Sequence, residues 1–287
     1  MELHNLYRPI TATPFKKNEQ YMEFEPCAAL KPYIRCFWGT KQAFRQTKSE
    51  VSVKDIVTPD TCADIIFTAD LTANKIENRF CGIDDRTFST DSIRNEDKTV
   101  FSFAIRFYAW SAAVFAEDSL KNTKNAFFDV GYHFLTIKKE IEKYLFDVTD
   151  ISELISIAEK VLLQRLCDRH NYQTVWQAVC TIVEKKGNLS VSDLEQELLT
   201  GSRQLQRLFG EYVGVSPKSL ASMVRYQCLW SDIIYHKNFD ILDAVYKYGY
   251  SDQAHLCHDF KKYHSMNIAE ARKYALQSVG NVQDVLP

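Results

Sequence analysis

Hydrophobic and polar positions alternate with a period of two in the first part of the chain. The clearest case is the stretch 101–107, in which Phe101, Phe103, Ile105 and Phe107 alternate with Ser, Ala and Arg. This alternation is typical of a half-buried β-strand. Aromatic and β-branched residues between turn signals predict further strands at 33–38, 51–57, 63–67 and 79–83. Residues 84–98 are polar and are predicted to form a loop.

From residue 134 onward the apolar positions follow a helical period. The change of period predicts an α+β fold, with a β-rich, barrel-like or sandwich-like N-terminal domain and an all-α C-terminal domain. We place the β-rich domain at 1–133, a helical connector at 134–184 and the C-terminal domain at 185–287. The apolar stripes of the connector fit a dimer interface and completion of the N-terminal core equally well, and both remain open.

Local signals predict where helices of the C-terminal domain begin and end. Gly187 after two lysines predicts the end of one helix. Ser192 and Glu195 have the spacing of a capping box at the start of the next. Pro217 is suited to the first turn of a long helix that follows.

A short turn-and-helix pattern occurs twice in this domain. Leu205 and Phe209 stand four residues apart, and Leu256 and Phe260 repeat the pair 51 positions later. Residues at i and i+4 share one face of a helix, which leaves the other faces polar. A long helix between the copies would span roughly 30 Å, and successive major-groove faces of DNA lie about 34–36 Å apart. The repeat therefore indicates a double helix-turn-helix, although a helical bundle with no DNA role can have the same spacing.

The polar faces of both predicted helices carry side chains that can bind bases and phosphates. The candidate DNA-binding residues are Ser202, Arg203, Gln204, Gln206, Arg207, Gln253, Ala254, His255, His258 and Lys261. At least half of protein–DNA contacts go to the backbone, so not all of them are expected to touch bases. We interpret Asp252 as a helix cap or an orienting partner, and Arg225 as a structural residue of the long helix.

The C-terminal segment resembles the DNA-binding domain of the AraC/XylS family of bacterial transcription regulators. The resemblance rests on the motifs RQLQRLF at 203–209, GVSPK at 214–218, GYSDQAHL at 249–256 and FKK at 260–262, together with Arg225. It implies seven helices with two helix-turn-helix units joined by a linker helix, sequence-specific binding to double-stranded DNA, and transcription control, more often activation than repression.

Two departures from the family pattern concern the second unit. Ser265, Met266, Asn267 and Ile268 stand where a closing Gly-x-x-Pro is usual, and His258 stands in place of the usual Arg. A neutral His makes a weaker phosphate or guanine contact than Arg. The motifs at 58–60, 64–67, 81–82 and 107–110 are similar to an uncharacterised β-rich domain that precedes this module in some members, which implies a sensor or assembly role.

Composition and charge limit the other classes of function. The chain has 287 residues, of which 46% are hydrophobic and 25% charged, so it is long enough for two domains and unlike a disordered protein. The net charge of −2 does not indicate nucleic acid, but residues 200–273 hold ten Lys or Arg against seven Asp or Glu. No signal peptide, C-x-x-C pair or long apolar run occurs, so we expect reduced cysteines, a cytoplasmic location and no membrane partner.

The remaining candidate chemistry is sparse. Trp38, Arg106, Tyr108 and Trp110 are candidate residues for a pocket that holds an anionic or aromatic effector, and the alternative is a plain aromatic core. His255 and His258 share a helical face, but Cys257 between them cannot join a metal site on it. No His lies between residues 5 and 132, which argues against a cupin-like metalloenzyme. P-loop, Rossmann and nucleophile-elbow motifs are missing, so no catalytic residue, cofactor or metal is predicted.

These patterns together predict a one-component transcription regulator rather than an enzyme, and an activator more readily than a repressor. The N-terminal domain would sense a small-molecule effector or form a homodimer, and RNA polymerase is a further candidate partner. The alternative is a non-catalytic assembly module that uses the helix-turn-helix pair to bind proteins. An enzyme in the β-rich domain with DNA binding as its regulation is the third hypothesis.

Overall fold

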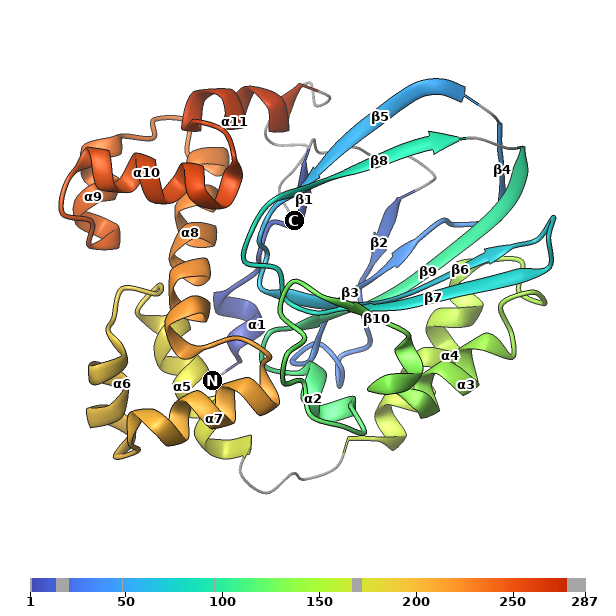
Figure 1. Ribbon diagram of the computed structural model, residues 1–287, viewed down its shortest axis with the longest axis horizontal. Coiled ribbons are helices and arrows are strands. Elements are labelled where there is room, and N and C mark those ends of the chain that lie inside the picture. The colour runs from blue at the N-terminus through green and yellow to red at the C-terminus, as the bar shows by residue number, and fades with distance from the viewer. Residues whose placement is uncertain (1, 14–20, 48, 95–96, 167–171, 278–287) are drawn as a thin grey trace.

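The computed structural model describes residues 2–13, 21–47, 49–94, 97–166 and 172–277. Strands dominate the described chain up to residue 108, and the elements from residue 135 onward are helices. Figure 1 shows the strands on one side of the molecule and helices α5 (Tyr172–Glu184) to α11 (Ile268–Leu276) on the other. The predicted α+β class, with a β-rich N-terminal part and an all-α C-terminal part, is confirmed.

The larger sheet is antiparallel throughout and has seven strands within the described residues. Its order is β10-β7-β6-β9-β3-β2, and β4 pairs with β9 outside this path. The strands are β2 (Met22–Phe24), β3 (Ile34–Gly39), β4 (Phe44–Gln46), β6 (Cys62–Asp70), β7 (Lys75–Cys81), β9 (Lys98–Tyr108) and β10 (Phe127–Phe128).

A smaller sheet contains, among the described residues, β1 (Ala12–Thr13), β5 (Ser49–Val57) and β8 (Phe88–Arg94) in that order. β8 runs antiparallel to β5, with Ile56 opposite Ser89 and Val57 opposite Phe88. The loop predicted over 84–98 is therefore wrong for the residues of β8. The sequence FSTDSIR is mostly polar and has no alternating apolar pattern that would predict a strand. Its strand conformation is stabilised by pairing with β5 rather than by local propensity.

The strand predicted over 101–107 is confirmed as part of β9, and its four apolar side chains are buried. Ala104 and Arg106 on its other face are buried as well, so this part of β9 is covered on both faces rather than half-buried. Phe107 stacks on Phe134 with ring centroids 5.8 Å apart, and Phe103 stacks on Phe37 at 6.0 Å. Short helices cover the face on which these rings lie: α2 (Ala112–Phe115), the 3-10 helix η1 (Val130–Tyr132), α3 (Leu135–Glu142) and α4 (Ile151–Gln164). Burial of these aromatic rings supplies much of the driving force for this part of the fold.

The helices of the predicted connector 134–184 pack in two different places. α3 and α4 pack against each other beside the sheet, where Asn78 of β7 donates a hydrogen bond to Glu142 at 2.9 Å. α5 packs instead on the C-terminal helices, against α6 (Val191–Leu198), α7 (Ser202–Tyr212) and α8 (Pro217–Tyr235) alike. The predicted connector therefore does not pack as one unit: α3 and α4 lie beside the sheet, and α5 lies on the C-terminal helices. The domain boundaries at 133 and 184 stay predictions.

Helix α8 joins the two parts of the molecule. Its Gln227 is 2% exposed, accepts a hydrogen bond from the Ile10 amide at 2.9 Å and donates to the carbonyl oxygens of Ile10 and Pro59. The buried hydrophobic residues of both parts belong to a single cluster. A buried amide with its partners satisfied fixes the position of α8 against the N-terminal part.

The structure adds two findings on the chemistry expected of the chain. The seven described cysteines are unpaired. Among the described helices, none combines the length and apolar character that crossing a bilayer requires.

Candidate nucleic-acid interface

The first helix-turn-helix unit consists of α6 (Val191–Leu198) and α7 (Ser202–Tyr212). α6 begins two residues earlier than predicted, because Ser190 is the N-cap and forms the capping box with Asp193 rather than Ser192 with Glu195. The turn between the helices contains Leu199, which has φ +50° and is 94% exposed. A left-handed conformation is costly for a Leu, so this turn is strained.

The side chains of α7 divide cleanly between core and solvent. Leu205 and Phe209 are fully buried, and Leu208 is 2% exposed. The five residues predicted to contact DNA on this helix are all exposed: Ser202, Arg203, Gln204, Gln206 and Arg207. An exposed polar face on the second helix of such a unit is the surface that enters a major groove.

The two arginines of α7 differ in their surroundings. Arg207 forms an i, i+4 ion pair with Glu211, with the closest N–O distance 2.9 Å. Arg203 is exposed and has no ion-pair partner among the described residues. Its guanidinium is therefore available to a base or phosphate, whereas that of Arg207 must first leave Glu211. The sequence analysis missed Glu211, although its i+4 spacing from Arg207 was a readable signal.

The second unit consists of α9 (Ile241–Tyr248) and α10 (Gln253–His264). Asp252 caps α10, as predicted, by accepting a hydrogen bond from the His255 amide at 2.7 Å. Leu256 and Phe260 are buried. The predicted contact residues of this helix are again all exposed: Gln253, Ala254, His255, His258 and Lys261.

His255 is oriented by residues of the preceding turn. Its Nδ1 lies 3.1 Å from the Ser251 hydroxyl, and its ring meets that of Tyr250 edge-on with centroids 5.2 Å apart. These contacts leave Nε2 directed away from the turn, where it can meet a ligand of the exposed face. Among the described residues, no group of three potential metal ligands lies together.

Arg225 has the structural role that was predicted for it. Its guanidinium lies 4.5 Å from the centroid of the Tyr250 ring and 3.2 Å from the Asp259 carboxylate. The Tyr250 hydroxyl donates to the same carboxylate at 3.0 Å. This arrangement ties the linker helix α8 to α10 and to the turn that precedes it. The sequence analysis did not identify Asp259.

A buried histidine also lies between α8 and α10. His264 is fully buried against Trp230, with ring centroids 4.5 Å apart, and its Nδ1 is 2.8 Å from the Tyr226 hydroxyl. Burial lowers the pKa of His264 to about 4. It is therefore neutral at physiological pH and acts as part of the core.

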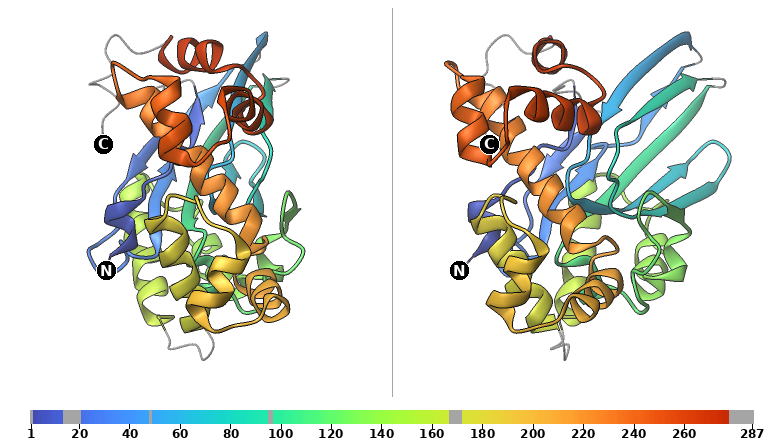
Figure 2. Two further views of the ribbon diagram at one scale, coloured as in Figure 1. Left: turned by 90° about the vertical axis from the view of Figure 1, so that its left-hand side faces the viewer. Right: turned by 60° about the vertical axis from the view of Figure 1, so that its left-hand side comes forward.

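The two recognition helices lie at opposite ends of α8, as Figure 1 and both views in Figure 2 show. α7 and α10 keep the offset of 51 residues, but α6 and α9 are offset by 50, so the second turn is one residue longer. The second unit also ends firmly without Gly-x-x-Pro, because Asn267 and Glu270 form a capping box at α11. The all-helical region α5 to α11 has seven helices within the described residues, as the family resemblance implied.

The four candidate effector residues form two separate pairs. Arg106 is 7% exposed, donates to Asp64 through Nε at 2.9 Å, and lies 5.5 Å from the Trp38 ring centroid. Tyr108 and Trp110 stack at 4.4 Å in a second, buried pair. An anionic effector at Arg106 would have to compete with Asp64, which the sequence analysis missed.

The two exposed recognition faces, linked by one long helix, define a DNA-binding transcription regulator. Residues 194–274 match the family model described as a helix-turn-helix domain, and the C-terminal segment is a domain of the AraC type. Residues 22–129 match a model described as a domain of unknown function, DUF6597. The resemblance found in the sequence is thus confirmed.

Solved structures similar to the chain belong to ToxT from Vibrio cholerae. The crystal structure from strain O395 has a TM-score of 0.40 and 13% identity, covering 85% of this chain and 99% of that one. The unsaturated fatty acid bound form from strain SCE256 has a TM-score of 0.39 and 12% identity, covering 91% and 98%. Similarity at this level supports no functional conclusion, and no curated protein sequence matches the chain.

Proposed function

We propose that this protein is a sequence-specific regulator, in its usual mode an activator, that reads DNA with both α7 and α10. The observation that carries the proposal is the division of side chains on both helices. All ten predicted contact residues are exposed, while the paired Leu and Phe of each helix are buried. Any amphipathic surface helix shows this division, but here the exposed faces at both ends of one linker helix carry Arg, Gln and His, which can bind bases and phosphates.

The dimensions of α8 support simultaneous contact. It has 19 residues, which corresponds to about 28 Å at 1.5 Å per residue. When the width of the helices at its ends is added, the separation between α7 and α10 comes close to one turn of B-DNA, which is about 34 Å. One chain would then place α7 and α10 in successive major grooves, with Arg203 and Arg207 supplying the strongest base or phosphate contacts of the first unit.

The N-terminal part is proposed to sense a small molecule or to mediate dimerisation. Arg106, Asp64 and Trp38 form a compact polar group within an apolar sheet, which is the kind of group that fixes the orientation of a ligand. Exposed apolar side chains on α3 and beside it favour an interface with a second copy: Tyr132, Leu135, Tyr144 and Phe146. RNA polymerase is the partner that activation would require.

A second candidate function is protein binding by the helix pair. Leu242 and Tyr246 stand four residues apart on α9 and are 57% and 85% exposed. An exposed apolar pair on one helical face is a usual contact point for another protein. This surface lies beside α10, so it is compatible with DNA binding as well.

Selection of duplexes from a random pool by the full-length protein tests the proposal. A recovered motif, together with affinity that falls steeply with salt, is the expected result. Lys237→Ala, which removes an exposed charge outside both recognition helices, is the control for Arg203→Ala. If no motif is recovered and low salt gives no duplex binding, the protein-binding function becomes the better account.

A further inference from the structure

Two segments of the N-terminal part form one compact block next to the C-terminal helices. They are residues 82–87, between β7 and β8, and residues 120–126, before β10. The Gly82 amide donates a hydrogen bond to the Ala126 carbonyl at 3.2 Å, and a Cβ added at Gly82 would lie 1.9 Å from the Thr123 carbonyl oxygen. Because Gly82 has no side chain, the two segments pack backbone against backbone. We call this block the bridge.

Side chains also hold the bridge together. The Asp85 amide donates to the side-chain oxygen of Asn125 at 2.9 Å, and the side-chain amide of Asn125 donates to the Asp85 carboxylate at 2.8 Å. The Lys124 ammonium lies 2.9 Å from the same carboxylate. Burial raises the pKa of Asp85, but its bonds to Lys124 and Asn125 and the charge of Lys262 on α10 together hold that pKa below its usual value. Asp85 is therefore ionised and attracts the second recognition helix.

The bridge contacts the end of the first recognition helix, α7. The Leu120 amide donates a hydrogen bond to the Glu211 carbonyl at 2.9 Å. Thr123 is 1% exposed, and its hydroxyl donates to the Leu120 carbonyl at 2.7 Å. A Cβ added at Gly214, just after α7, would lie 2.5 Å from the Thr123 hydroxyl. The chain after α7 thus fits against the bridge with no room for a side chain at Gly214, whose φ of +83° also favours glycine.

The bridge also contacts the end of the second recognition helix, α10. The Thr87 hydroxyl donates a hydrogen bond to the Tyr263 carbonyl, in the last turn of α10. The last carbonyls of a helix have no partner within it, so a donor from outside satisfies one of them here. The same small block of the N-terminal part therefore holds the C-terminal ends of both recognition helices.

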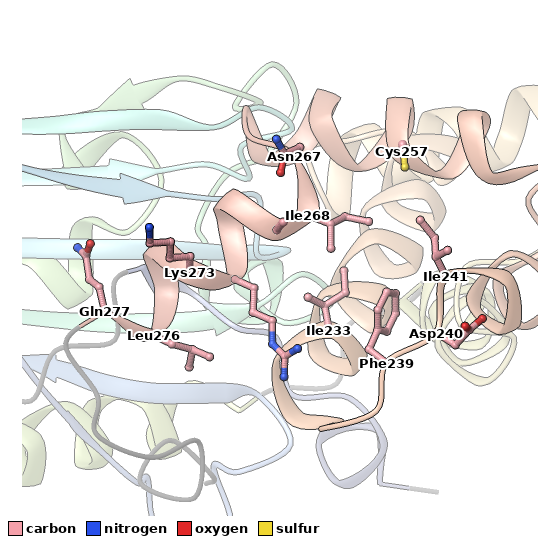
Figure 3. A pocket seen from close by; sticks show the side chains of 12 residues that line it. Ile233, Phe239, Asp240, Ile241, Cys257, Asn267, Ile268, Lys273, Leu276 and Gln277 are labelled. Atoms are coloured by element: carbon pink, nitrogen blue, oxygen red, sulfur yellow. The ribbon is translucent and has the colours of Figure 1, made fainter.

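The second unit has no such support at its groove. A groove of about 1030 Å³ lies between the end of α8, α9, α10 and α11, with apolar walls that include Phe239, Ile241 and Ile268 (Figure 3). None of the described residues that line it belongs to the N-terminal part. An unfilled groove provides no packing that would resist a tilt of the second unit on α8. The bond from Thr87 is therefore the contact that we expect to limit such a tilt.

We propose that the bridge fixes the separation of α7 and α10, and with it the operator spacing that the protein accepts, with Asp85 and Thr87 as positioning residues. This role rests on the proposed reading of DNA by both helices. α7, the bridge, α10 and α8 form a closed ring of contacts, which resists tilting more than two units joined by one helix alone. One base pair inserted between the half-sites moves the second one by about 3.4 Å and rotates it by roughly 35°. Two rigidly held units cannot follow that change.

The affinity of the full-length protein for duplexes of altered spacing tests this role. The wild type should bind the selected duplex about tenfold more tightly than a duplex with one extra base pair between the half-sites, because only one unit can then be seated. Thr87→Val removes the donor to Tyr263 but keeps the side-chain size, and this ratio should fall to about threefold. Thr87→Ser keeps the hydroxyl and should keep the wild-type ratio. Thr136→Val, at an exposed position of α3, is the matched control. A wild-type ratio in Thr87→Val would overturn the proposal.

A second measurement does not require DNA. Hydrogen exchange of the backbone amides in the last turn of α10 should be about threefold faster in Thr87→Val than in the wild type or Thr136→Val, because this end of the helix opens more readily without its contact. Unchanged exchange would overturn the proposal whatever the DNA result. If the wild type selects no duplex, the operator role falls together with the proposed function, and faster exchange in Thr87→Val would show that the failure does not lie in the bridge.

Discussion

The two helix-turn-helix units have the same plan but are stabilised in different ways. α7 begins at Gly201 without a side-chain cap, and the turn before it contains the strained Leu199. α10 begins at Asp252, whose carboxylate caps the helix, and the turn before it contains Gly249 at φ +67°. The second unit thus has the more favourable local structure.

The contacts of the two units with the rest of the molecule differ as well. The carbonyl of Glu211, near the end of α7, accepts a hydrogen bond from the Leu120 amide of the N-terminal part at 2.9 Å. The second unit is held mainly by α8, through Arg225–Asp259 and Tyr226–His264, although Thr87 also donates to the Tyr263 carbonyl. Equivalent helices in a duplicated domain therefore owe their positions to different partners.

The largest expected effect is on the free energy of unfolding, when the ion pair that holds each unit is removed in turn. Asp259→Asn should lower the free energy of unfolding by roughly 3 kcal/mol, because it leaves a mostly buried Arg225 without its ion-pair partner. Glu211→Gln removes an exposed ion pair of the first unit and should cost no more than about 0.5 kcal/mol. Urea unfolding of both variants measures the contrast, and equal losses would contradict it.

For DNA affinity we expect the opposite order: substitutions in the first unit should weaken binding more than substitutions in the second. Arg203→Ala should weaken binding by roughly 1–3 kcal/mol and relax the preference at one base pair. His258→Ala should cost less and affect all sequences alike, because a neutral His makes weaker contacts than a guanidinium. Titration of the selected duplex with each variant measures both. A larger loss for His258→Ala would reverse the assignment of the units.

Lowering the pH should destabilise the second unit more than the first, because the buried His264 belongs to α10. The pKa of His264 is lowered to about 4 by burial, so the unfolded chain binds an extra proton between about pH 6.5 and 4. Stability is therefore lost as the pH falls through this range, by about 2 kcal/mol at pH 5. His264→Phe should remove this slope, as measured by unfolding at several pH values. His258→Asn, at an exposed position, should keep it.

The smallest expected effect concerns the turns. Leu199→Gly should raise stability by about 0.5 kcal/mol, because relief of the left-handed strain exceeds the greater chain entropy of Gly in the unfolded state. Gly249→Ala should have the opposite sign, since an added Cβ would lie 2.2 Å from Asn188 in a left-handed position. Thermal unfolding of both variants measures the difference, and a loss for Leu199→Gly would argue against strain in the first turn.

Sequence reasoning succeeded where one periodic signal dominates. The alternation along β9 and the i, i+4 pairs of α7 and α10 predicted their elements, because burial of one face determines both pattern and structure. It failed for β8, whose polar sequence is ordered by a partner distant in the chain. The capping box was misplaced by two residues because Ser190 and Ser192 both precede suitable acidic residues. Partners such as Glu211 and Asp64 become evident only from the three-dimensional contacts.

A base-resolved footprint of the full-length protein on its selected duplex tests the central claim most directly. Two protected blocks about one helical turn apart are expected, one assigned to α7 and one to α10. Arg203→Ala should weaken protection in one block, and His255→Ala in the other. A single block that responds to both substitutions would contradict the claim that the two units read separate major grooves.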